Sequence, residues 1–137
     1  MGIEINNQTR RKISKHGLVA VFKSVIKFLS KSKKLKSEFV LSLALVSSKE
    51  IAKINLCYRK KNEPTDVLSF AYHSNKENFY GEIILCPEII KKNSKLDGVS
   101  FDFELRKNLI HGMLHIFGFK HGKIMFQIQE AIINKLA

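Results

Sequence analysis

The chain has no tryptophan, only two cysteines and two prolines, and half as many acidic as basic residues. Cys57 and Cys86 are far apart in the sequence, so they form no C-x-x-C motif and are too few for a disulfide framework. We expect both to be reduced thiols in the core. The longest apolar run, around residues 39–46, is too short to cross a bilayer, and no basic leader followed by an apolar segment opens the chain. These absences predict a soluble cytoplasmic protein without a membrane partner.

The scarcity of acidic residues leaves a formal net charge of +12 and a pI near 9.8. Lysines can simply cover the solvated faces of helices, and this explanation stays open. So large a surplus nevertheless favours a polyanionic partner, and RNA or a ribosomal surface is the obvious class. An acidic membrane fits less well, because no aromatic amphipathic helix accompanies the basic residues.

The length fits one domain over residues 1–137, and hydrophobic periodicity marks its strands and helices. The expected fold is α+β, with about four strands in a mixed sheet packed against about five helices. The expected strands over residues 66–72 and 80–85 are joined by the polar residues 73–79, and we expect them to form an antiparallel hairpin. Phe103 is expected on the buried side of the fourth helix. The expected strands are residues 1–7, 39–46, 66–72 and 80–85, and the expected helices are residues 13–34, 48–58, 87–95, 101–117 and 123–136.

Three of the five histidines, His111, His115 and His121, lie close together in the sequence. Residues four apart share one face of a helix, so His111 and His115 can point their rings at a single ion. Gly118 can adopt the left-handed conformation that ends a helix, which would let His121 turn back as a third ligand. Three histidines leave a coordination position for water, as in catalytic zinc sites. The sequence therefore predicts a metal site on a helix and the turn that follows it.

The same histidine spacing occurs in metzincin peptidases, whose helix carries a glutamate as general base directly after the first histidine. Gly112 occupies that position here. Without the glutamate, peptide hydrolysis lacks its proton acceptor. A zinc peptidase or a zinc hydrolase of small molecules is therefore a minor alternative.

Residues 111–121, HGMLHIFGFKH, closely resemble the H-G-x-L-H-L-x-G-Y-D-H signature of the YbeY family, bacterial metal-dependent endoribonucleases of ribosomal RNA maturation. Residues 56–70 are similar to the family block that contains Y-R-x-K-x-x-P-T-D-V-L-S-F, and residues 81–83 and 125–130 are similar to its G-D-I strand and closing helix. Lys120 departs from the pattern, because the family usually has aspartate there. The acidic connection that commonly follows the third histidine is also almost absent.

The resemblance implies that His111, His115 and His121 hold one Zn²⁺ ion, although histidines also suit nickel, copper and iron. It also implies that Arg59 lies across the cleft and is the residue most important to RNA cleavage. A guanidinium suits this role, since it binds phosphate bidentately and stabilises growing negative charge. Further candidates for the RNA-binding cleft are Lys61, Ser69 and Lys120.

Asp66 and Glu82 are candidate general bases, although structural roles at strand ends suit them better. His16 and His73 match no motif and are expected to be exposed. The leading expectation is a single-strand-specific endoribonuclease acting in rRNA processing and ribosome quality control, with either water or the RNA 2′-hydroxyl as nucleophile. The alternative is an RNA-binding ribosome-assembly factor with weak or no nuclease activity. Partners such as ribosomal proteins or a GTPase cannot be read from the sequence.

Overall fold

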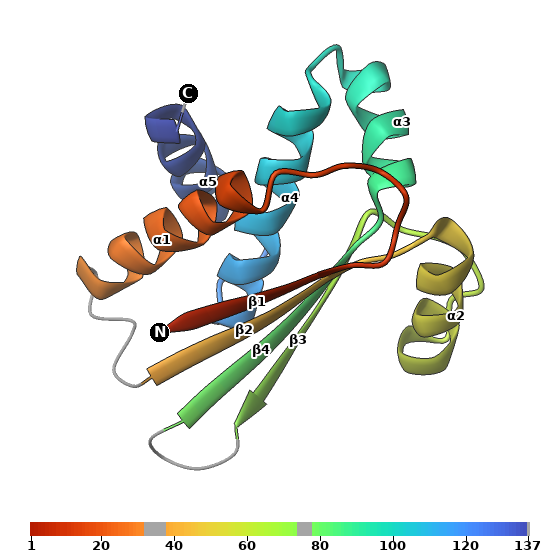
Figure 1. Cartoon of the computed structure of the whole chain (residues 1–137). Helices are drawn as coiled ribbons and strands as arrows, with labels where there is room; N and C mark the ends of the chain where they lie inside the picture. Colours follow the sequence, from red (N-terminus) through yellow and green to blue (C-terminus); the bar gives the residue numbers. More distant parts are fainter. Residues whose placement is uncertain (32–37, 74–77, 137) are drawn as a thin grey trace.

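A computed structural model describes residues 1–31, 38–73 and 78–136 of the protein. Within these ranges, the predicted alternation of strands and helices is confirmed (Figure 1). The first helix begins at Lys15 rather than at residue 13, and the predicted continuation over residues 32–34 lies outside the described residues. The elements are β1 (Gly2–Asn7), α1 (Lys15–Lys31), β2 (Glu38–Leu45), α2 (Ser48–Arg59), β3 (Val67–His73), β4 (Asn78–Leu85), α3 (Pro87–Asp97), α4 (Phe101–Ile116) and α5 (Lys123–Leu136).

The four strands form one mixed sheet in the order β1-β2-β4-β3. β1 pairs with β2 and β2 pairs with β4 in parallel, whereas β3 and β4 form the predicted antiparallel hairpin. Parallel neighbours need a long crossover, which α1 provides between β1 and β2. β3 is left at the edge of the sheet, beside the start of α3 and the end of α2.

Alternate residues of β2 face the main core, and Phe39, Leu41 and Leu43 are fully buried there. Figure 1 shows α1, α4 and α5 covering this face, whose core cluster includes side chains from all three helices. The opposite face packs against α2 through a smaller cluster that contains Ile51 and Ile84. The histidine helix α4 is therefore a central element of the core as well as a candidate site element.

Two expectations about burial are wrong. Cys57 is exposed, because α2 turns Ile51 and Asn55 toward the sheet and leaves Cys57 on its outer side. Phe103 is 39% exposed, because the first turn of α4 is covered on the side of Glu104 and Leu105 only. Cys86 is buried, as expected.

Among the described residues, no helix combines the length and the apolar character that crossing a lipid bilayer requires.

Candidate metal centre and RNA cleft

Helix α4 begins and ends at residues that suit those positions. Ser100 accepts a hydrogen bond from the backbone N–H of Phe103 at 3.1 Å. Asp102 and Glu104 lie in the first turn, where negative charge interacts favourably with the positive end of the helix dipole. At the other end, Gly118 has φ +90°, the left-handed conformation expected of it. The chain reverses there and brings His121 back toward α4.

The three histidine side chains converge on one point. Nε2 of His115 lies 3.1 Å from Nε2 of His111 and 3.2 Å from Nε2 of His121. A tetrahedral zinc ion with Zn–N distances of about 2.0–2.1 Å separates its ligand nitrogens by about 3.3–3.4 Å. The nitrogens are thus close to the spacing of three ligands around one metal, and these histidines could hold a metal ion.

Gln129, on α5, orients the first of these histidines. Its amide oxygen lies 3.0 Å from Nδ1 of His111, and its side chain is only 5% exposed. With the oxygen facing the ring, Nδ1 carries the proton, and the lone pair of Nε2 points toward the other two histidines. The sequence analysis missed this residue. The sequence did contain an indication of it: Gln129 lies four residues from Met125 and four from Ile133, on the buried side of α5.

For two of the three histidines, His111 and His115, the surroundings favour the neutral imidazole that binds metals. Burial lowers the pKa of His111 and of His115 below the usual 6.5, and for His115 the neighbouring imidazoles add to this effect. A neutral imidazole is the form that ligates a metal, so a lowered pKa reduces the free-energy cost of deprotonating the histidine before the metal binds.

The histidine nitrogens open into a cavity of about 1010 Å³ between α4 and the edge strand β3. Arg59, Lys61 and Ser69 line the same cavity, so these three predicted residues lie in one space with the histidines. Lys120 is exposed in the turn after α4 and does not line that cavity.

Arg59 reaches the cavity from the last position of α2. Lys60 ends this helix with φ 58°, and its backbone N–H bonds back to the carbonyl of Leu56 at 3.1 Å. The guanidinium of Arg59 donates to the backbone oxygen of Ser69 at 3.1 Å, and its Cζ lies 5.4 Å from the ring centre of Phe70. The side chain is thereby held at the edge of the sheet, and its other N–H donors can meet a ligand.

The two candidate general bases lie in different places. Asp66 lines the cavity, where its carboxylate accepts from the Thr65 hydroxyl at 3.2 Å and its backbone oxygen accepts from the N–H of Cys86 at 2.9 Å. Glu82 lies on the other face of the sheet, near Tyr72, whose pKa is raised by desolvation and then by the Glu82 charge. Geometry therefore places only Asp66, of these two, beside the histidines.

The other two histidines lie apart from this centre. His16 is exposed on α1, as expected. The side chain of His73 lies outside the described part of the structure, so the expectation about it stays a prediction.

Close packing of α4 against β4 explains why residue 112 is a glycine. A Cβ atom at this position would lie 3.0 Å from Cδ1 and 3.4 Å from Cγ1 of Ile83 on β4. A side chain here would point into the sheet rather than toward the histidines. The glutamate of the metzincin helix thus has no room at this position, which agrees with the low rank of the peptidase alternative.

Comparison with known proteins identifies the family. The sequence profile described as "Endoribonuclease YbeY" matches residues 4–137. Proteins of that name are similar to this chain in Bdellovibrio bacteriovorus, with 34% identity over 99% of this chain and 95% of the relative, and in Petrotoga mobilis, with 35% identity over 96% and 92%. The solution structure of a Thermotoga maritima protein is similar over 98% of this chain and 88% of its own, with a TM-score of 0.68 and 28% identity. Because the profile and both relatives span nearly the whole chain, the chain belongs to the Endoribonuclease YbeY family.

Proposed function

We propose that this protein is a zinc-dependent endoribonuclease that cuts single-stranded RNA during ribosomal RNA maturation, with residues 1–137 acting as one catalytic domain. The observation that carries the proposal is the convergence of three Nε2 atoms in a cavity that also contains Arg59. The name shared by the relatives supports RNA as the substrate.

The histidines suit zinc because they offer three nitrogen donors, and the separations of His115 Nε2 from the other two are close to those of a tetrahedral site. When bound, zinc supplies a Lewis acid for a phosphoryl oxygen and lowers the pKa of a water molecule. His121 is exposed, so this side of the centre is open to a substrate. Gln129 keeps the ring of His111 in place through a bond to its outer nitrogen.

Arg59 binds and stabilises the scissile phosphate. The bond to the Ser69 carbonyl fixes the guanidinium in advance, so little side-chain entropy is lost when a phosphate arrives. Negative charge grows on the phosphate oxygens during cleavage, and a fixed cation at that point lowers the barrier. Lys61 adds a second positive charge along the same wall.

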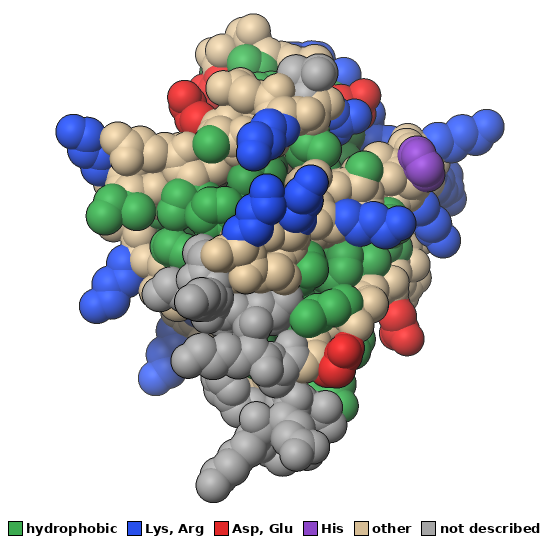
Figure 2. All heavy atoms as spheres, turned by 90° about the vertical axis from the view of Figure 1, so that its left-hand side faces the viewer, with side chains coloured by type: hydrophobic (Ala, Val, Ile, Leu, Met, Phe, Trp, Pro, Cys, Tyr) green, Lys and Arg blue, Asp and Glu red, His purple; other side chains and the backbone are tan. Residues whose placement is uncertain are grey.

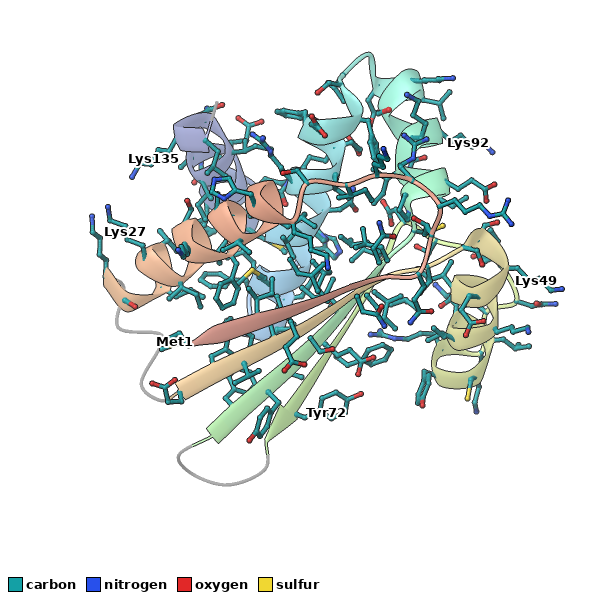
Figure 3. The ribbon with its side chains drawn as sticks, in the orientation of Figure 1. Met1, Lys27, Lys49, Tyr72, Lys92 and Lys135 are labelled. Carbon is teal, nitrogen blue, oxygen red and sulfur yellow. The ribbon has the colours of Figure 1, made fainter. Side chains whose placement is uncertain are left out.

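The surface charge favours an RNA partner, and the ribosome is the proposed setting. Basic side chains spread over the face in Figure 2, and Figure 3 shows Lys27, Lys49, Lys92 and Lys135 projecting from four different helices. Positive charge spread over several helices attracts a polyanion without fixing its orientation. Single-stranded RNA can enter a cavity with its bases splayed apart, whereas the bases of a duplex stay stacked inside it.

The test compares metal content and RNA cleavage in the wild type, His115→Ala, Arg59→Ala and the control Lys27→Ala. We expect zinc in all except His115→Ala. His115→Ala should lose cleavage, and Arg59→Ala should lose about 10²- to 10³-fold in rate with its metal retained, as for loss of one preorganised donor. Lys27→Ala should behave like the wild type.

Two results would contradict this proposal. Zinc-loaded wild type that cuts no faster than either site variant would leave an RNA-binding assembly factor as the better description. Equal cleavage of duplex and single-stranded RNA would remove the strand specificity.

A further inference from the structure

Phe126 on α5 is an aromatic residue that lines the cavity and stays open to solvent. It is 51% exposed, and it lines the same cavity as the three histidines. Among the described residues it belongs to neither of the two core clusters. The buried side of α5 is formed by other residues, namely Met125, Gln129, Ile132 and Ile133. Packing of the core therefore does not account for an aromatic ring at this place.

The ring belongs to the part of the cavity that holds the histidines. Phe126 precedes Gln129 by three residues, so both side chains lie on one side of α5, and Gln129 contacts His111 at 3.0 Å. The backbone N–H of Phe126 donates to the carbonyl of Gly122 at 3.1 Å, and Gly122 directly follows His121. Phe126 is thus fixed to the turn that carries the third histidine.

The cavity wall offers different groups for the two parts of a nucleotide. Arg59 and Lys61 supply positive charge for a phosphate. Of the described residues that line the cavity, Phe126 is the only phenylalanine or tyrosine. Single-stranded RNA is bound largely by stacking its unpaired bases on aromatic side chains. An open phenyl ring beside the phosphate-binding groups suits the base of the same strand.

We propose that Phe126 is a stacking platform for a base of single-stranded RNA whose neighbouring phosphate lies at the histidines. This inference rests on the proposed nuclease function for the presence of RNA in the cavity. A phenyl ring has no hydrogen-bonding groups, so it accepts the flat face of any base without reading its edge. The bases of a duplex are covered by their neighbours on both faces, so the platform also selects single strands.

A double-mutant cycle between the ring and the bases tests the platform. One ligand is a short single-stranded RNA, and the other is the same ribose–phosphate chain built from stable abasic residues, with equal charge. Fluorescence anisotropy measures binding of each to the full chain in the presence of a chelator, so zinc-dependent cleavage does not interfere. Loss of the bases should weaken binding to the wild type about 5- to 100-fold more than binding to Phe126→Ala, as for one stacked base.

Three further variants separate stacking from other roles of the side chain. Ile124→Ala removes an apolar side chain of α5 that is 69% exposed and does not line the cavity, so it should behave like the wild type. Phe126→Leu keeps an apolar side chain but lacks a flat face, and it should resemble Phe126→Ala. Phe126→Trp restores a flat face and should bind at least as tightly as the wild type.

The platform would be refuted if loss of the bases cost the same affinity in Phe126→Ala as in the wild type, or if Phe126→Leu bound like the wild type. Zinc content should be equal in Phe126→Ala and the wild type, and loss of zinc would show that the ring supports the histidine turn instead. RNA cleavage without this dependence on Phe126 would refute the platform alone. Base-dependent binding through Phe126 without RNA cleavage would refute the nuclease function alone.

Discussion

Gln129 lies at a position where the pattern of α5 calls for an apolar residue, and its amide oxygen meets Nδ1 of His111, the nitrogen of that ring that faces away from the other two histidines. Such outer contacts fix the orientation of a ligand before the metal arrives. We expect Gln129→Ala to leave the fold intact and to weaken zinc binding by about 10- to 100-fold. Chelator competition measures this loss. The control is Gln127→Ala, an exposed glutamine on the same helix, and equal affinities in the two variants would rule out the orienting role.

The partly buried histidines His111 and His115 lead to a second prediction at this scale, which concerns their protonation. Because burial lowers the pKa of His111 and His115 below 6.5, the unfolded chain binds more protons than the metal-free folded protein as the pH falls toward and below that value. Stability should therefore decline as the pH falls through this region and stay level above it.

Thermal unfolding of metal-free protein between about pH 7.5 and 5.5 checks this decline, and above this lower limit carboxylates contribute little. His115→Ala should flatten the curve, whereas His16→Ala, at an exposed position, should leave it unchanged. A wild-type curve without slope over the interval would refute the argument.

Between elements, the contact of α4 with β4 depends on a glycine. Alanine in place of glycine inside a helix normally stabilises by about 1 kcal/mol. At Gly17 of α1 the new Cβ would meet Ser14 at 3.5 Å, an ordinary contact, so Gly17→Ala should gain this stability. At Gly112 the new Cβ would lie 3.0 Å from Cδ1 of Ile83, and overpacking of this kind costs about 1–3 kcal/mol.

Urea unfolding should accordingly rank Gly17→Ala above the wild type and Gly112→Ala below it. Ile83→Val deletes the Cδ1 atom that the new methyl group would meet, so the double variant with Gly112→Ala should show a favourable coupling above about 0.5 kcal/mol. Additive effects would mean that the helix shifts to accommodate the methyl group.

The elements themselves were predictable, because each follows a local pattern. Alternation marked β2 and helical spacing marked α1, while Ser47 caps α2 by accepting from the N–H of Glu50 at 3.2 Å. The order β1-β2-β4-β3 was not predictable in this way. Hydrophobic alternation shows which face of a strand is buried, but it carries no information about which strand lies beside it.

The candidate site was predictable only in part. Helical spacing and Gly118 predicted how three histidines could meet, and the resemblance placed Arg59 across the cleft. Gln129 was missed because a polar residue in a helix is normally read as exposed, and burial of a polar side chain depends on tertiary neighbours. The prediction that Cys57 is buried failed for the converse reason, because cysteine was treated as an apolar residue and therefore placed in the core.

At the scale of the whole molecule, the basic side chains of the surface and the apolar side chains of the core occupy different sides of the helices. Basic side chains occupy the outer surfaces of several helices (Figure 3), while the sheet packs against the apolar sides of α1, α4 and α5. The net charge of +12 therefore describes what the surface attracts and says little about how the chain folds.

Helix α4 both covers the sheet and carries two of the three histidines, and every strand precedes it in the chain. During synthesis the inward side chains of the strands, such as Leu41 and Leu43, can be covered only by α1 until α4 has been made. Completion of the core and convergence of the three histidines therefore depend on the same helix, so a nascent chain that lacks α4 has neither the closed core nor the histidine cluster.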